Sequence, residues 1–233
     1  MTRDGDFEAR RQAARDRLDA DDPAMKAERD DTSRSGFFAN VYEKAQGDAA
    51  AVPWADLEPK PQLLNWLAEH PGQGRRAIDV ACGLGDNAAA LADAGYDTTA
   101  FDYTEKAVNW ARRRFPVKPV DWQVADLLNL PANWRGAFDL VHECYTVQSV
   151  PPERHAEFSA AIASLVAPGG TLLVYARSRK EDEQTDGPPW PLTPSELDLY
   201  AASGLKREAS DSFDIVRPDK TIPHRFDVWR RAG

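Results

Sequence analysis

The chain has 233 residues, of which 42% are hydrophobic and 29% charged, and its formal net charge at pH 7 is −9. This length and composition suit one large domain with a substantial core and exclude a wholly disordered chain. The acidic balance disfavours nucleic acid as a partner, no apolar window is long enough to cross a membrane, and the charged N-terminus lacks a signal peptide's apolar region, so we expect a cytoplasmic protein.

The first part of the chain is charged. Residues 1–35 are rich in Arg, Asp and Glu, which predicts a partly flexible segment. A single domain is expected over 36–233. Its first part, 36–70, combines helical spacing of apolar residues with a proline-rich loop, which predicts helices, one of them beginning at Pro61, and we expect a lid here. The core is expected over 75–233.

The core alternates between strand and helix patterns. Helices are expected over 86–95, 104–115 and 151–167, and strands over 76–81, 97–102, 120–126, 137–145 and 170–177. This order predicts a mainly parallel, doubly wound α/β sheet, and ligands of such sheets bind beyond the carboxyl ends of the strands.

The C-terminal part has a different pattern. After a polar loop, Thr193 and Glu196 fit a capping box, and Thr104 is placed to cap an earlier helix. Two further strands, 205–216 and 223–232, follow each other without a helix between them, which predicts antiparallel neighbours.

The most informative stretch is the turn after the first strand of the core. Gly83 to Ala88 match the pattern GxGxxG/A, and Asp102 follows at the distance of a ribose-binding acid, which is the signature of a dinucleotide site. Two carboxylates oppose that interpretation, because Asp79 and Asp86 flank the turn and would repel a diphosphate. A cationic ligand, such as a sulfonium with an ammonium group, would be favoured instead.

The spacing Asp79-x-x-x-Gly83-x-Gly85, with Asp102 and then Asp126 after the next two strands, resembles the class I S-adenosylmethionine-dependent methyltransferases. The resemblance implies a Rossmann-like, seven-stranded sheet of order 3-2-1-4-5-7-6 whose last strand is antiparallel, with S-adenosyl-L-methionine as cofactor. It implies cofactor contacts for Tyr42, Trp54, Asp79, Ala81, Gly83, Gly85, Asp102, Tyr103, Asp126, Leu127 and Glu143. Alanine at position 81 replaces a glycine of the common pattern, and its small side chain is expected to fit.

A narrower resemblance concerns two segments outside the turn. "VPWADLEPKPQLLNWL" and "DGPPWPLTPSEL" are similar to segments of the thiopurine methyltransferase group, which includes small enzymes acting on thiols, halides and metalloid ions. The resemblance implies that Trp54 contacts the cofactor and that the acceptor is surrounded by Phe37, Phe38, Tyr42, Arg177 and Trp190.

The methyl acceptor is expected over the ends of the first and fourth strands, near residues 142–150. Methyl transfer from a sulfonium is an in-line displacement, so the protein mainly positions the nucleophile and excludes water. A thiol needs no dedicated base, whereas a hydroxyl does, and His142 is the best candidate. Tyr145 and Arg177 complete the predicted catalytic set. The other histidines, His70, His155 and His224, are expected at the surface, and no residues have the spacing of a metal site.

The sequence therefore predicts a methyltransferase, monomeric or homodimeric, that uses S-adenosylmethionine and acts on a small molecule. The nucleophile is S, O or N, with a thiol favoured. Two alternatives stay open: a nicotinamide-dependent oxidoreductase on a similar sheet, and a cofactor-binding protein without catalysis.

Overall fold

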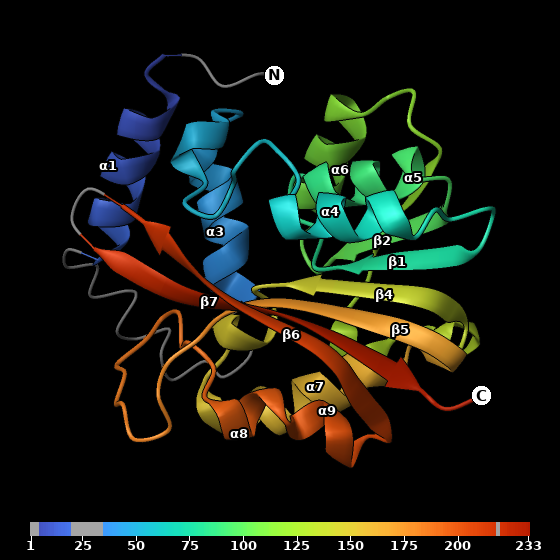
Figure 1. Ribbon diagram of the computed structural model, residues 1–233. Helices are drawn as coiled ribbons and strands as arrows, with labels where there is room; N and C mark the ends of the chain where they lie inside the picture. The colour runs from blue at the N-terminus through green and yellow to red at the C-terminus, as the bar shows by residue number, and fades with distance from the viewer. Residues whose placement is uncertain (1–4, 20–34, 218–219) are drawn as a thin grey trace.

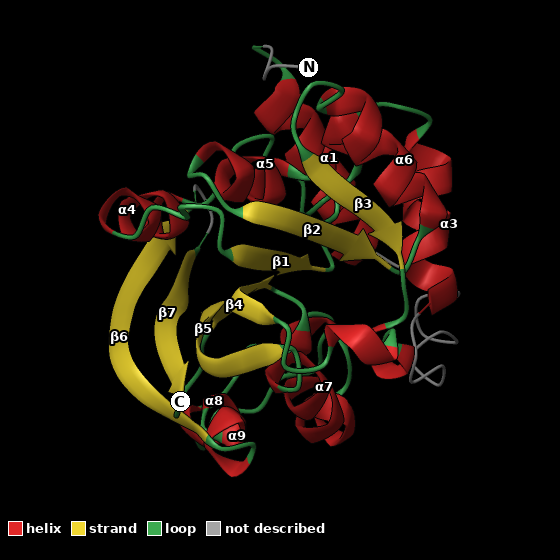
Figure 2. Ribbon diagram, turned by 90° about the vertical axis from the view of Figure 1, so that its right-hand side faces the viewer, coloured by secondary structure: helices red, strands yellow, loops and turns green. Residues whose placement is uncertain are grey.

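A computed structural model describes residues 5–19, 35–217 and 220–233. Its centre is a seven-stranded sheet of order β3-β2-β1-β4-β5-β7-β6, in which β7 runs antiparallel to its neighbours β5 and β6 (Figures 1 and 2). This is the order and direction that the resemblance implied. The strands are β1 (Arg76–Val80), β2 (Asp97–Asp102), β3 (Val120–Val124), β4 (Phe138–Cys144), β5 (Val166–Arg177), β6 (Leu205–Val216) and β7 (Thr221–Arg231).

Helices cover both faces of the sheet, with α4, α5 and α6 on one side and α7, α8 and α9 on the other (Figure 1). Their bounds are α1 (Phe7–Asp19), α3 (Ser35–Ala45), α4 (Pro61–Glu69), α5 (Asp86–Asp93), α6 (Glu105–Arg114), α7 (His155–Ala163), α8 (Pro194–Leu197) and α9 (Leu199–Ala202). Because helices cover both faces, every residue of β1 after Arg76 is buried.

Helices α1 and α3 form a smaller unit at the edge of the α4–α6 layer. Phe7 of α1 and Tyr42 of α3 share one apolar cluster with Leu84 of the glycine turn and Trp110 of α6. Arg11 ties α1 to the loop before α4 by donating to the carbonyl of Ala55, 2.7 Å away. Part of the predicted charged segment is thus a helix, while its residues 1–4 and 20–34 lie outside the described part of the chain.

The predicted elements agree with the observed ones to within about four residues, with three differences of detail. Helix α7 is shorter than the helix predicted over 151–167. Strand β5 begins at Val166, four residues before the predicted start. Thr104 stands at the N-cap position of α6 without capping it, because its hydroxyl donates to Asp102 instead, at 2.8 Å. The capping box of Thr193 and Glu196 is confirmed. None of the described helices is long and apolar enough to span a membrane.

Candidate active site

The turn between β1 and α5 depends on left-handed backbone conformations. Gly83 has φ +54° and Gly85 has φ +86°. A Cβ atom on Gly85 would lie 2.6 Å from the ring of Trp122, so a side chain has no room there. Ala81 also has a positive φ, +52°. From the sequence we expected the small side chain of Ala81 to matter because room is limited at this position. Ala81 is in fact exposed, and glycine is favoured there by the left-handed backbone conformation.

Asp102 joins the end of β2 to this turn. One carboxylate oxygen accepts the backbone N–H of Gly83 at 3.0 Å, and the other accepts the backbone N–H and the hydroxyl of Thr104. Burial raises the pKa of Asp102, and these donors oppose that rise. The predicted ribose-binding acid is therefore held rigidly beside the glycine turn.

The three residues predicted at the adenine end lie at the same edge of the sheet. Tyr103 is 53% exposed, directly after Asp102, so its ring is available to a ligand. Asp126 follows β3 and caps a short 3-10 helix (Leu127–Asn129), accepting the N–H of Leu128 at 2.9 Å. Leu127 is buried.

Asp86 does not act as the sequence suggested. Its two carboxylate oxygens accept from the guanidinium of Arg114 on α6, at 2.7 and 2.6 Å. The ion pair neutralises the charge that was expected to repel a diphosphate, so that half of the electrostatic argument was wrong. The other half, Asp79, is 1% exposed, and among the described residues the ring of a histidine is its one ion-pair partner.

That histidine is His142, and the two residues form a buried pair. Asp79 on β1 and His142 on β4 stand opposite each other in the parallel register. His142 Nδ1 lies 2.7 Å from Asp79 Oδ1, and both side chains are almost completely enclosed. Among the described residues, Asp79 Oδ2 and His142 Nε2 have no hydrogen-bond partner. Buried polar atoms without partners are costly, so these two atoms mark a place for a ligand.

Glu143, the next residue on β4, points to the opposite face of the sheet. Its carboxylate accepts the N–H of Thr146 at 3.0 Å and the hydroxyl of Tyr200 at 3.3 Å, and it is fully buried. Alternation along a strand explains why neighbours on β4 differ in this way. Both carboxylate oxygens are hydrogen-bonded on the side of the sheet that α9 covers, so we withdraw the cofactor contact predicted for Glu143.

Tyr145 has the most elaborate surroundings of the predicted catalytic residues. It directly follows β4, has φ +65°, and its hydroxyl lies 2.9 Å from His224 Nε2 on β7. Tyr175 on β5 packs edge-on against it at 5.3 Å, and the ammonium of Lys60 lies over both rings, 4.7 and 5.1 Å from their centroids. The sequence did not single out Lys60 or Tyr175.

Two histidines expected at the surface are buried. His224 is 1% exposed because the rings of Tyr145, Tyr175 and Phe213 pack around it. His155 is 1% exposed and lies 2.9 Å from Glu196 and 3.0 Å from the carbonyl of Val150. His70 is exposed, as expected.

The residues predicted around the acceptor fall into two groups. Phe37 and Phe38 of α3 lie 6.3 and 5.5 Å from the ring of Trp54, whose indole N–H donates to the Tyr42 hydroxyl at 3.0 Å. Tyr42 in turn lies against the turn, since a Cβ on Gly83 would be 3.3 Å from its hydroxyl.

Gln148 holds the second group together. Its side-chain oxygen accepts the backbone N–H of Arg177, and its backbone carbonyl accepts that of Trp190, at 2.6 and 2.8 Å. The structure thus brings the end of β5 and the loop before α8 to the segment that follows β4.

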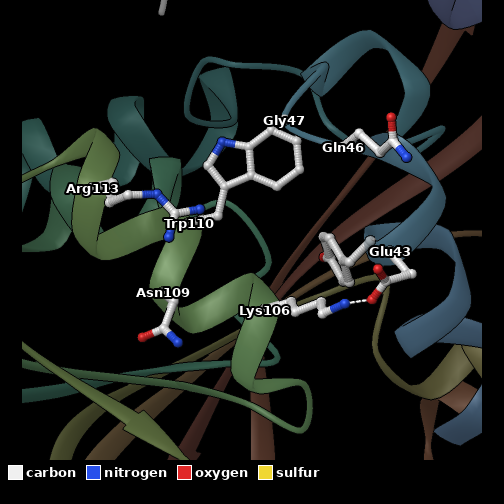
Figure 3. Close-up of a pocket in the computed structure, with 8 residues that line it drawn as sticks. Glu43, Gln46, Gly47, Lys106, Asn109, Trp110 and Arg113 are labelled. Atoms are coloured by element: carbon white, nitrogen blue, oxygen red, sulfur yellow. Dashed lines mark ion pairs between the residues drawn. The ribbon is translucent and has the colours of Figure 1, made fainter.

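A cavity of about 320 Å³ lies between α3 and α6 (Figure 3). Trp110 and Arg113 of α6 face Glu43 of α3 and Gln46, which follows α3, across it, and Glu43 forms an ion pair with Lys106. Tyr42 also lines it, so the cavity adjoins the glycine turn without including the Asp79–His142 pair.

Comparison with known proteins finds one known domain in this chain. Residues 77–170 match the model of a family described as "Methyltransferase domain". A ubiquinone biosynthesis O-methyltransferase of Bordetella avium (strain 197N) is 32% identical over 160 residues, which cover 63% of this chain and 65% of the relative. Glycine N-methyltransferase of Homo sapiens is 27% identical over 80% of this chain and 65% of its own. The chain spans between about half and just under two thirds of the first relatives it matches.

Solved structures agree on the fold. A chain from work described as "Conversion of a Disulfide Bond into a Thioacetal Group during Echinomycin Biosynthesis" has a TM-score of 0.70 at 22% identity, covering 85% of this chain and 92% of that one. The 1,6-didemethyltoxoflavin-N1-methyltransferase of Burkholderia thailandensis has a TM-score of 0.61 at 20% identity, covering 91% and 92%.

The matched residues form a methyltransferase domain with a Rossmann-like sheet. The strand order and the glycine turn with its following acids are similar to those of the class I S-adenosylmethionine-dependent methyltransferases. The comparisons thus support the predicted family, and the activity and cofactor of the whole protein are proposed below. Nothing in the comparisons favours the nicotinamide-dependent alternative.

The place of Asp102 makes a prediction for cofactor affinity. Asp102→Ala removes charge-assisted acceptors beside the turn, and we expect binding of S-adenosyl-L-homocysteine to weaken by about 1–3 kcal/mol. Calorimetric titration measures this, with Asp97→Ala at the exposed start of the same strand as the control. Equal affinity of the wild type and the Asp102 variant would contradict the assignment.

Proposed function

We propose that the protein transfers a methyl group from S-adenosyl-L-methionine to an oxygen of a small-molecule acceptor, with His142 as general base. One observation carries this proposal: His142 is oriented by a buried carboxylate and keeps one ring nitrogen unpartnered among the described residues. A hydroxyl nucleophile needs such a base, whereas a thiol does not.

The Asp79–His142 pair determines which ring nitrogen of His142 carries the proton. An ionised Asp79 only accepts hydrogen bonds, so the 2.7 Å contact requires that His142 donates through Nδ1–H. The lone pair of the neutral ring is then on Nε2, which takes the proton from the acceptor hydroxyl as the new oxygen–carbon bond forms. Carboxylate–histidine pairs orient the general base of other enzymes in the same way.

The residues around the turn fit S-adenosylmethionine. The unpartnered, buried Oδ2 of Asp79 suits an ammonium group, and Asp102 with the exposed ring of Tyr103 suits the ribose and adenine. Gly83, Gly85 and Ala81 allow the backbone to approach, and Asp126 with Leu127 lies at the adenine end. The bound cofactor supplies the methyl group, and the reaction leaves S-adenosyl-L-homocysteine.

The proposed acceptor atom differs from the thiol that the sequence favoured. Several relatives are named ubiquinone biosynthesis O-methyltransferase, which supports oxygen. Likeness to the thiopurine methyltransferase group is kept as a hypothesis about the segment around Trp54 and about Trp190. A second copy of the chain is not required by any residue of the proposed site.

Residues 36–70 are proposed as a lid over the core at 75–233, because Tyr42 of α3 contacts Gly83 and is bonded to Trp54. We expect the backbone amides of α3 to become protected from hydrogen exchange when S-adenosyl-L-homocysteine binds. Exchange measured with and without this ligand tests the lid, with α7 on the opposite face as internal control. Equal exchange of α3 in both states would exclude it.

An acceptor screen with labelled S-adenosylmethionine tests the proposed function. Phenols, carboxylates, thiols, amines, halides and metalloid oxyanions are compared at equal concentration. Label on phenols or other hydroxyl compounds is expected. Transfer to thiols alone would overturn the oxygen assignment, and tight binding of NAD without binding of S-adenosyl-L-homocysteine would overturn the proposal itself.

A further inference from the structure

A buried histidine joins two segments that follow different strands of the sheet. His155, the first residue of α7, is 1% exposed. Its Nδ1 lies 2.9 Å from Glu196 Oε1 on α8, and its Nε2 lies 3.0 Å from the backbone carbonyl of Val150, in the segment that follows β4. Neither contact entered the proposed function.

Both ring nitrogens of His155 carry a proton in this arrangement. A carbonyl oxygen only accepts hydrogen bonds, so Nε2 donates to Val150. Burial tends to raise the pKa of Glu196, but hydrogen bonds from His155 and Thr193 lower it overall, so this side chain is a carboxylate that only accepts. Nδ1 therefore donates as well, and the ring is an imidazolium.

Glu196 also holds the loop between β5 and α8, residues 178–193, which is called the β5–α8 loop below. Its Oε2 accepts the backbone N–H of Thr193 at 2.8 Å and the guanidinium of Arg179 at 3.2 Å. Arg179 in turn donates from Nε to the carbonyl of Pro191 at 2.7 Å. One carboxylate thus connects the buried ring with both ends of the loop.

The β5–α8 loop reaches the segment after β4 at two points. The backbone N–H of Trp190 donates to the carbonyl of Gln148 at 2.8 Å. The second point is the contact of Glu196 with His155, whose other nitrogen is bonded to Val150. The position of the loop therefore depends on what the imidazole ring can donate.

Loss of one ring proton would leave an acceptor facing an acceptor. A neutral imidazole has a single N–H, so either Glu196 or Val150 would then face a lone pair of the ring. The ring is enclosed, and buried polar atoms without partners are costly. A neutral His155 therefore favours the separation of α8 from the segment after β4.

The charges around the ring oppose one another. Glu196 favours a positive ring, whereas the guanidinium of Arg179 and the position in the first turn of α7 disfavour it. In the described part of the chain, the ring of His155 forms no ion pair with the other titratable side chains of the elements packed around it, which are Glu153, Arg154, Glu157, Arg177, Asp198 and Tyr200.

We propose that His155 is a pH-sensitive switch: its imidazolium holds α8 and the β5–α8 loop against the segment after β4, and loss of one ring proton releases the loop. The loop opens as pH rises, because the closed arrangement requires the proton. Histidine is the side chain whose charge ordinarily changes near physiological pH. The inference goes beyond the proposed function and depends on neither the methyl donor nor the acceptor.

A pH titration of the full chain followed by nitrogen NMR tests the switch. Between pH 5 and pH 9 we expect the ring of His155 to pass from two protons to one, and the backbone amide signals of Arg179 and Trp190 to change with the same midpoint. The exposed His70 is the internal control, since its titration should leave those amides unchanged. A ring with one proton at pH 5, a ring that keeps both protons up to pH 9, or amides with a different midpoint overturns the proposal.

Two variants separate this titration from that of Glu143, whose pKa burial raises to about 7. In Glu143→Gln the change of the Arg179 and Trp190 signals should persist. In His155→Gln it should disappear, and protection of the loop amides from hydrogen exchange at pH 6 should fall about tenfold, because glutamine cannot titrate and does not supply both donors. A loop titration that vanishes in Glu143→Gln or persists in His155→Gln overturns the proposal. None of these measurements needs turnover, so their failure leaves the proposed function standing.

Discussion

Replacement of His142 by glutamine is expected to lower kcat for a hydroxyl acceptor by about 10²–10⁴-fold, the usual contribution of a general base. Glutamine has a similar volume and can still donate to Asp79, so the fully buried site keeps its packing and a hydrogen bond. Affinity for S-adenosyl-L-homocysteine should stay within about threefold, because Asp79 Oδ2 is left for the cofactor ammonium. Rate measurements at saturating cofactor, together with calorimetry, separate the two effects.

Asp79→Asn is the informative partner of that variant. The amide would donate to His142 Nδ1 and place the ring proton on Nε2, which removes the base without removing the ring. Turnover of a hydroxyl should therefore fall as far as in His142→Gln, while cofactor affinity also falls, because the carboxylate charge is lost. A loss of turnover that is equally large for a thiol at pH 9 would show that the pair is structural rather than catalytic.

The backbone architecture could be predicted from the sequence because it follows from local patterns. Strand bounds, the left-handed turn at Gly83 and the capping box at Thr193 each depend on residues close together in the chain. Strand order came from the resemblance of the turn and its acids, not from periodicity. The local patterns and the resemblance each describe single segments of the chain, and the structure agrees with the strands, the turn and the strand order that they predicted.

Pairing between segments is what the sequence could not show. Asp79 and His142 are 63 residues apart, and their contact depends on the register of β1 against β4. Asp86 was interpreted as a free charge because its partner, Arg114, lies at the far end of the next helix. His224 is buried by the rings of Tyr145 and Tyr175 from other strands, which local patterns do not show. Lys60 lies in a loop, where no periodicity applies.

Glu143 gives the second large effect, and it appears in stability rather than in turnover. Burial raises the pKa of this carboxyl to about 7, from 4.5, against the opposing hydrogen bonds of Thr146 and Tyr200. The folded state therefore binds the proton more tightly, and the free energy of unfolding falls as pH rises between about 4.5 and 7. Since one pKa unit corresponds to about 1.4 kcal/mol, the loss above pH 7 is about 3 kcal/mol.

Glu143→Gln tests this because the amide cannot ionise, and because its oxygen can accept the Thr146 N–H while its NH2 group donates to the Tyr200 oxygen. We expect the variant to match the wild type at pH 5 within about 1 kcal/mol and to be more stable by about 3 kcal/mol at pH 8.5, measured by urea unfolding at both values. Glu157→Gln, an exposed site on α7, serves as the control and should leave the pH dependence unchanged. Parallel stability curves for wild type and Glu143→Gln would show that the buried carboxyl is already ionised at pH 5. The charge would then be a permanent part of the α9 side of the sheet, and its hydrogen bonds to Thr146 and Tyr200 would have to offset its desolvation.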